Sequence, residues 1–297
     1  MAILIRIALV LALAGCATVR ERLGVDGGRV LRASLKTEDG ATIALWRWSP
    51  IRLDARRVFV VPELGFDHRL VAPLCARLRD AGYDVATLDG REITGQHGRV
   101  DGWDGWNVDV VRAAAAFRPD AIIGIGVGGR AALLAGRVGL GRVVVAVNVP
   151  VRSAVGNEAL RLSLAVDGYN PRAWLARGLG SLLLATGRNT SGAVRSRLAQ
   201  LAVPISVDLS ADITDRMRIG GREELHGLNV RALASMKDNL VNSEDALPEG
   251  GRGFAHTRRL ALLEGFRADY GHLDWLVDAT ALDEVVPAVM EEIEDGQ

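Results

Sequence analysis

Between residues 57 and 149 the chain alternates short, continuously apolar runs with longer amphipathic stretches. The apolar runs are Arg57–Val61, Asp84–Leu88, Ala121–Ile125 and Arg142–Val149. The stretches with helical periodicity are His68–Gly82, Trp106–Phe117 and Gly129–Val138. A strand that is apolar at every position is buried on both faces, as happens when helices cover both sides of a parallel sheet. The alternation therefore predicts an α/β fold with a mostly parallel sheet and helices on both faces.

Further strands are expected on either side of this region. The turn signal Asp39-Gly40, in which glycine supplies a positive φ, predicts an antiparallel hairpin near the N-terminus. The sheet is then expected to have about eight strands, followed by a closing helix. The additional elements are the strands Val30–Leu35, Ala41–Trp48, Asn229–Ser235 and Arg258–Phe266 and the helix Leu282–Glu294.

The alternation breaks after the last of the central apolar runs, which predicts one α/β core interrupted by an inserted helical cap. Two helices, Arg172–Leu184 and Gly192–Leu201, are expected in the cap. The predicted ranges are 1–15 for a signal peptide, 16–29 for an anchor linker, 30–151 and 226–297 for the two parts of the core, and 152–225 for the cap.

The N-terminus predicts a targeting segment. Its apolar run, Ile7–Ala14, is too short to span a membrane but suits the hydrophobic region of a signal peptide. The run ends in Leu13-Ala14-Gly15-Cys16, which resembles a bacterial lipobox, where the cysteine is acylated. A secretory signal with an incidental cysteine is the alternative. The lipobox predicts a lipoprotein of the cell envelope, anchored to the membrane through Cys16. Ala17 resembles the sorting pattern for the periplasmic face of the outer membrane.

Composition excludes several classes of function. The chain has 36 basic and 36 acidic residues, whereas a nucleic-acid binder needs a cationic excess, so we expect no nucleic-acid partner. Two cysteines exclude a disulfide framework, and Cys75 is expected to be a small buried apolar residue. The five histidines share no metal-ligand spacing, so the sequence predicts neither a metal site nor a cofactor.

A glycine-rich turn follows the predicted strand Ala121–Ile125 and has two interpretations. Gly124, Gly126 and Gly129 satisfy the dinucleotide-binding pattern G-x-G-x-x-G. That pattern belongs in the first strand–helix–strand unit and needs an acid after the next strand, whereas here about four strands precede it and Asn148 follows the next one. The second interpretation is a nucleophile elbow, a sharp turn that exposes a catalytic side chain between a strand and a helix.

Around this turn, most of the mature chain resembles the α/β-hydrolase fold, in particular lipase- and esterase-like members near the polyhydroxyalkanoate synthase branch. The segments that carry the resemblance are Val58–Arg69 for the oxyanion loop, Ala81–Arg91 for the next strand and loop, Trp103–Ala116 for the helix before the elbow, Val230–Val241 for the acid and Ala268–Trp275 for the histidine. Their order matches the superfamily. The resemblance implies about eight strands, a helical cap and a cleft between core and cap.

Two positions depart from the pattern of that family. Gly126 stands at the elbow centre, where the family has Ser, Asp or Cys, and glycine has no side chain that attacks a substrate. Its permissive backbone still suits the strained turn. Pro62-Glu63 stands in the oxyanion loop where His-Gly is usual. A carboxylate that pointed inward there would oppose a developing negative charge.

The resemblance leaves part of a catalytic triad. It assigns His272 and Asp238 to the histidine and acid positions, and the backbone N–H groups of Leu64 and Val127 to the oxyanion hole. Asp274 is an alternative partner for the histidine, although its place two residues away favours a solvated loop carboxylate.

Three hypotheses for the function follow. In the first, the protein is a membrane-anchored pseudoenzyme that binds an apolar or acyl ligand, or a protein partner, in the old cleft. The apolar stretch Trp174–Ala185 would then cover an acyl pocket or simply pack on the core. In the second, a dyad of His272 and Asp238 hydrolyses ester or acyl substrates without a covalent serine intermediate, with the histidine as general base. In the third, the protein is an esterase that uses Ser153.

Overall fold

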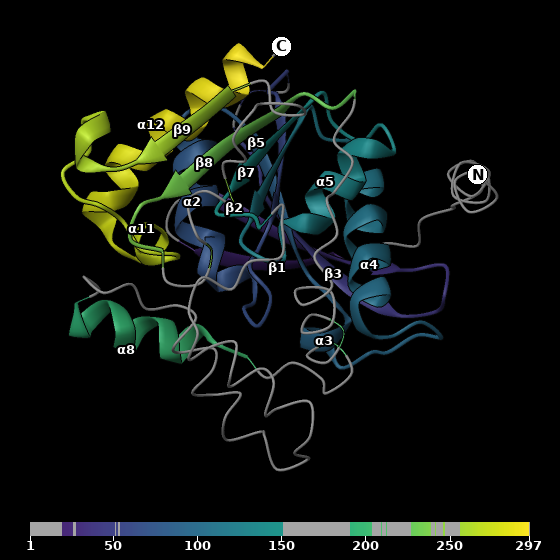
Figure 1. Ribbon diagram of the computed structural model, residues 1–297. Coiled ribbons are helices and arrows are strands. Elements are labelled where there is room, and N and C mark those ends of the chain that lie inside the picture. The colour runs from purple at the N-terminus through teal and green to yellow at the C-terminus, as the bar shows by residue number, and fades with distance from the viewer. Residues whose placement is uncertain are drawn as a thin grey trace.

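The computed structural model describes residues 20–25, 28–50, 52, 54–150, 191–203, 209, 212, 227–238, 241, 246 and 256–296. The described residues form one nine-stranded sheet with helices on both of its faces (Figure 1). The strands are β1 (Arg20–Val25), β2 (Gly28–Lys36), β3 (Thr42–Trp48), β4 (Arg57–Val61), β5 (Asp84–Asp89), β6 (Ala121–Ile125), β7 (Val143–Val147), β8 (Val230–Ser235) and β9 (His256–Leu260).

The strands follow the spatial order β1-β2-β3-β5-β4-β6-β7-β8-β9. The pairs from β1 to β5 are antiparallel, and those from β5 through β9 are parallel. Strand β6 lies in the middle and is buried at every position, between β4 and β7. The predicted α/β fold with a mostly parallel sheet is therefore confirmed.

The sheet has one strand more than the eight or so that were predicted. Strand β1 pairs antiparallel with β2, so that Arg20 lies opposite Ala33 and Val25 opposite Gly28. These residues fall within the range 16–29, which the sequence analysis assigned to an anchor linker. A strand is hard to predict in the segment Arg20–Val25 because three of its six residues are charged.

Helices cover the two faces of the sheet and create two apolar cores. One core lies under α2, α11 and α12 and the other under α4 and α5 (Figure 1). Cys75 is fully buried in the first of them, as predicted. The helices are α2 (His68–Asp80), α3 (Arg91–Thr94), α4 (Gly102–Phe117), α5 (Arg130–Arg137), α8 (Gly192–Leu201), α11 (Asp274–Val277) and α12 (Ala279–Asp295), with a 3₁₀ turn at Leu262–Glu264.

The last strand is shorter than predicted. The sequence pattern predicts a strand over Arg258–Phe266, but β9 ends at Leu260 and the chain enters the 3₁₀ turn. Gly265 ends the 3₁₀ turn with φ = 90°, a left-handed conformation that glycine adopts without strain. Leu263, which the prediction placed in the sheet, is 98% exposed at this turn.

Of the predicted cap, the described part is mainly α8, whose bounds match the predicted helix Gly192–Leu201. Helix α8 packs on α2 and α11, and its Leu198 is fully buried in the first core. The predicted helix Arg172–Leu184, Ser153 and the stretch Trp174–Ala185 lie outside the described residues, as do the signal peptide and Cys16. Within the described ranges, no helix has the length and apolar character needed to cross a bilayer.

A buried charge cluster fastens the hairpin between β2 and β3 to α4. The Arg91 guanidinium, 1% exposed, donates to Asp39 at 2.6 Å and to Asp109 at 2.7 Å. Both carboxylates are also nearly fully buried. A single cation therefore neutralises two carboxylates that have almost no access to water.

We expect Arg91→Met to lower the free energy of unfolding by ~3–5 kcal/mol, because two buried carboxylates would lose their only shared cation. The matched control is Arg52→Ala, which breaks a pair with Asp54 whose side chains are more than 70% exposed. That change is expected to leave the free energy of unfolding almost unchanged, because water screens the exposed pair. Denaturant unfolding of both variants measures the two values. Equal losses would show that the buried cluster contributes no more than a surface pair.

Candidate functional site

The site lies where β6 turns into α5, at the carboxyl end of the central strand. Gly126 occupies the centre of the turn with φ = 55°, the left-handed conformation expected of an elbow. Its N–H donates to the carbonyl of Val147 on the neighbouring strand at 2.9 Å. The sharp turn predicted from the glycine-rich sequence is therefore present.

The other glycines of the turn allow close approach of the backbone. A Cβ on Gly124 would lie 2.7 Å from the carbonyl oxygen of Gly129, so strand and helix would be pushed apart. A Cβ on Gly128 would overlap the carbonyl oxygen of Pro62 and lie 2.9 Å from the nitrogen of Leu64. The loop after β4 thus packs directly on the elbow.

Glu63, from that loop, points into the site. Glu63 is 5% exposed, and its carboxylate accepts four hydrogen bonds. The backbone N–H groups of Leu64 and Gly128 donate to Oε1 at 2.8 and 3.2 Å, and the N–H of Val127 donates to Oε2 at 3.1 Å. The fourth donor is Nε2 of His272, 2.6 Å from Oε2. The predicted oxyanion donors Leu64 and Val127 therefore converge, but on a carboxylate of the chain itself.

The Glu63 carboxylate fills the space where a side chain at position 126 would begin. A Cβ built on Gly126 would overlap Oε2 of Glu63 and lie 2.5 Å from its Cδ. The same Cβ would lie 2.7 Å from Nε2 of His272. An oxygen of Glu63 thus takes the place beside the histidine that an elbow side chain would occupy.

The structure brings together His272 and Asp238, which the family resemblance assigned to the histidine and acid positions. Asp238 follows β8, His272 follows β9, and Nδ1 of the histidine lies 2.6 Å from Oδ2 of the aspartate. Both side chains are 1% exposed. Asp274, the alternative partner, instead begins α11. The described arrangement is a buried imidazole between two carboxylates, Asp238 and Glu63.

The two carboxylates decide the protonation state of the imidazole. Burial by itself lowers the pKa of His272, because it penalises the charged form. The charge and hydrogen bond of Asp238, together with those of Glu63, outweigh that effect and raise the pKa from 6.5 to about 10. At neutral pH the ring is therefore an imidazolium that donates from both nitrogens, and it has no free lone pair with which to act as a base.

This pKa predicts a pH dependence of stability. The folded-state value lies above the unfolded one, so the stabilisation is complete below about pH 6.5 and is lost as the pH rises toward 10. Between pH 7 and 9 this residue is expected to lower the free energy of unfolding by about 1.4 kcal/mol per pH unit. Unfolding of wild type and of His272→Gln across this range checks it, with exposed His97→Gln as the control. A slope unchanged by His272→Gln would contradict the raised pKa.

Two further residues hold the site in roles that the sequence pattern did not indicate. Asn148, at φ = 54°, donates from Nδ2 to Ser235 Oγ and to the carbonyl of His272, and its Oδ1 accepts from the N–H of Ser235. It thereby links the strand that leads to Asp238 with the histidine loop. Trp106 donates from Nε1 to the carbonyl of Gly128 at 3.1 Å. The available signal was a polar residue directly after the apolar run Val143–Val147.

The geometry also bears on the dinucleotide interpretation of the glycine pattern. In that interpretation the first N–H groups of the helix bind a pyrophosphate. Here the N–H groups of Val127 and Gly128 already hold the Glu63 carboxylate, whose charge would repel a phosphate. Among the described residues, no group of three or more histidine, cysteine or carboxylate side chains is placed to hold a metal ion.

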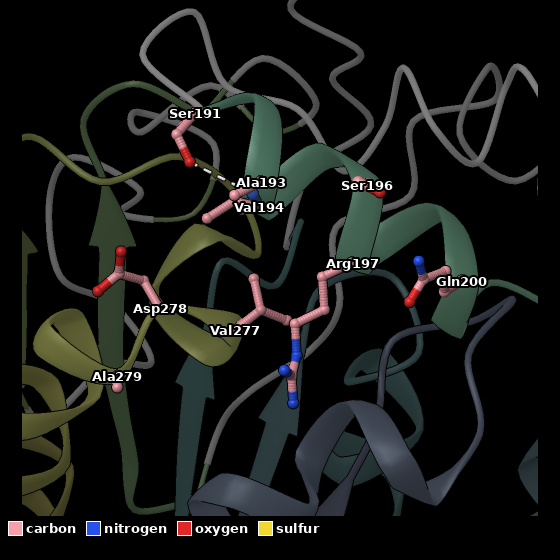
Figure 2. A pocket seen from close by; sticks show the side chains of 9 residues that line it. All are labelled: Ser191, Ala193, Val194, Ser196, Arg197, Gln200, Val277, Asp278 and Ala279. Carbon is pink, nitrogen blue, oxygen red and sulfur yellow. Dashed lines mark hydrogen bonds between the residues drawn. The ribbon is translucent and has the colours of Figure 1, made fainter.

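A separate groove of about 540 Å³ lies between α8 and the junction of α11 with α12 (Figure 2). Figure 2 shows Arg197 and Val194 on α8 facing Val277 and the segment that begins α12. The volume is within the range of small-molecule sites. The groove is lined by Ser191, Ala193, Val194, Ser196, Arg197, Gln200, Val277, Asp278 and Ala279, and it includes neither His272 nor Glu63.

No family model matches the chain, and no curated protein matches its sequence. Solved structures do resemble it. A bromoperoxidase from Bacillus anthracis superposes with a TM-score of 0.67 at 14% identity, covering 89% of this chain and 99% of that one. A thermophilic esterase from Thermogutta terrifontis gives 0.64 at 12% identity, covering 95% and 99%. The enol-lactonase from Burkholderia xenovorans gives 0.63 at 15% identity, covering 88% and 99%.

These similarities establish the fold. The chain has the α/β-hydrolase fold, with its mostly parallel sheet and its helices on both faces. Identities of 12–15% do not transfer the activity of any of these proteins, because one fold supports many functions. Function must be argued from the residues of the site.

Proposed function

We propose that this chain is a lipid-anchored protein of the bacterial cell envelope, in which an α/β-hydrolase fold binds a ligand or partner without catalysing hydrolysis. One observation carries the proposal. The Glu63 carboxylate occupies the backbone N–H groups at the elbow, beside an elbow residue, Gly126, that has no side chain. The protein would therefore be a pseudoenzyme.

The chemistry of acyl transfer explains why this observation matters. A serine hydrolase needs a nucleophile, a neutral histidine that accepts its proton, and N–H donors aimed at the developing oxyanion. Gly126 offers no nucleophile, and the raised pKa of His272 keeps the ring protonated at neutral pH. The N–H donors are bonded to Glu63. All three requirements are thus opposed by described residues.

The alternative is a hydrolase that uses the dyad of His272 and Asp238 on ester or acyl substrates without a covalent serine intermediate. The 2.6 Å contact between the two side chains supports it. This mechanism needs the neutral imidazole, so its rate is expected to rise with pH toward 10. His272→Gln would abolish it.

The test uses the full chain, a fluorophosphonate probe and a series of p-nitrophenyl esters between pH 6 and 10. The proposal expects neither labelling nor ester turnover above that of a heat-denatured sample. Turnover that rises with pH and disappears in His272→Gln would favour the dyad. Labelling of wild type that disappears in Ser153→Ala would favour an esterase based on that serine.

The anchor has its own test. We expect the wild-type chain to incorporate labelled palmitate in a bacterial host and to sediment with the outer membrane. Cys16→Ser is expected to lose both the label and the membrane fraction, whereas Cys75→Ser keeps them. Equal labelling of wild type and Cys16→Ser would reject the lipobox. The partners proposed are the membrane, through the lipid, and an apolar or acyl ligand or a protein in the cleft. No cofactor, metal or nucleic acid is proposed.

A further inference from the structure

The four donors around Glu63 have the arrangement of a carboxylate-binding site. Each carboxylate oxygen accepts two hydrogen bonds, one pair at 2.8 and 3.2 Å and the other at 2.6 and 3.1 Å. Three of the donors are backbone N–H groups, which are fixed by the elbow and the loop after β4. The fourth is the buried ring of His272, held from behind by Asp238.

We propose that these donors form a built binding site for a small monocarboxylate, and that Glu63 is its internal ligand. The inference rests on the proposed function, since it assumes that the site binds a carboxylate without turning over a substrate. It goes further by naming the chemical group that these donors hold, which in wild type is the chain's own carboxylate and not the external ligand of the proposed function. In wild type the site is closed to external acids, because the chain holds its own carboxylate at a high effective concentration.

The charge of the surrounding groups and the direction of their N–H bonds both favour a carboxylate at this site. The N–H groups of Val127 and Gly128 precede α5, so the positive end of that helix faces the anion. His272 contacts both Asp238 and Glu63, so removal of Glu63 would leave Nε2 of the ring without its carboxylate partner, beside the vacated backbone donors. Three backbone N–H groups would then be buried without acceptors, which is unfavourable until an anion, bonded also by the protonated ring, replaces the lost one.

The size of the Glu63 side chain predicts which acid should fill the space that its removal leaves. The Glu63 side chain beyond Cα is equivalent to propionate, and beyond Cβ it is equivalent to acetate. Glu63→Gly should therefore create a space that propionate fills, and Glu63→Ala a space that acetate fills. Overpacking a buried site by one methylene is unfavourable, so each variant should prefer its matching acid.

The experiment measures thermal unfolding of the full chain in increasing sodium formate, acetate, propionate or butyrate at pH 7, with sodium chloride at equal ionic strength as reference. Both variants are expected to melt roughly 5–15 °C below wild type in chloride. The matching acid is expected to raise the melting temperature with half-saturation at roughly 0.1–10 mM. Wild type and Glu63→Gln, in which an amide fills the space, should respond to the acids no more than to chloride.

Every outcome decides the inference. If a variant is unfolded in chloride, the same titration is followed as recovery of the folded state, which the matching acid should produce. Failure of both variants to gain from any acid would overturn the carboxylate site. A response of wild type equal to that of the variants would show that Glu63 does not occupy it. Fluorophosphonate labelling of wild type would reject the proposed function instead, whatever the titration gives.

Discussion

Gly126→Ser by itself is expected to leave the chain unlabelled by a fluorophosphonate and to lower its free energy of unfolding by ~3–5 kcal/mol. The new Cβ would overlap Oε2 of Glu63, so the carboxylate must leave its donors. It would then be buried without partners, and His272 would lose the 2.6 Å contact. Supplying the missing nucleophile therefore disrupts the site that should activate it.

Adding Glu63→Ala to the same chain is expected to reverse this effect. The second change removes the colliding carboxylate, frees the N–H groups of Leu64 and Val127, and leaves His272 paired with Asp238 alone. The imidazole can then retreat from the introduced Cβ and accept a proton from the introduced hydroxyl. We expect the double variant to be more stable than Gly126→Ser alone and to be labelled by the probe.

A double-mutant cycle quantifies the coupling between positions 63 and 126. Unfolding of wild type, both single variants and the double variant should give an interaction energy of at least about 1 kcal/mol that favours the pair. Adding His272→Gln to the double variant should abolish its labelling. Labelling of Gly126→Ser alone, at the rate of the double variant, would show that Glu63 does not block the elbow.

Among substitutions that add one methyl group to the site, Gly128→Ala is expected to be the most destabilising. It should lower the free energy of unfolding by at least ~3 kcal/mol. Its Cβ would overlap the carbonyl oxygen of Pro62 and crowd the nitrogen of Leu64. Both are backbone atoms, so relief requires the loop after β4 to move. That loop carries Glu63, so the hydrogen bonds from Val127 and from position 128 would lengthen together.

Gly192→Ala is the matched control, since a Cβ at this first residue of α8 would meet nothing within 4 Å. It is expected to change stability by less than ~0.5 kcal/mol. Denaturant unfolding of both variants compares the two positions. Nitrogen-15 NMR of His272 would show whether Gly128→Ala also loosens its contact with Glu63. Similar small losses in both variants would mean that the loop does not pack on the elbow as closely as the structure has it.

The parts of the fold that could be predicted were mostly predicted from local patterns of apolar residues in the sequence. Apolar runs identified the central strands to within two residues at each end, because a strand buried on both faces has few polar positions to break the run. Strands at the two edges of the sheet were harder to predict from such patterns. Strand β1 carries three charged residues, and β9 ends at Leu260, before the 3₁₀ turn at Leu262–Glu264.

The residues of the candidate site likewise include some that could be predicted from the sequence and some that could not. The family resemblance assigned His272, Asp238 and Gly126 to loops that follow predicted strands, and in the structure these loops meet because the carboxyl ends of parallel strands lie at one edge of a sheet. Asn148 was not found, since its role depends on reaching two other loops, at Ser235 and at His272.

The sequence alone determined that this protein has an α/β fold and that no nucleophilic side chain stands at the elbow. Only the tertiary structure decided what stands there instead. Three of the four partners of Glu63 lie 64, 65 and 209 positions away along the chain, so no local pattern could show which way its side chain points. Once the strands align, N–H groups and an imidazolium converge on one place. A buried carboxylate is stable there because they satisfy its charge and its hydrogen bonds.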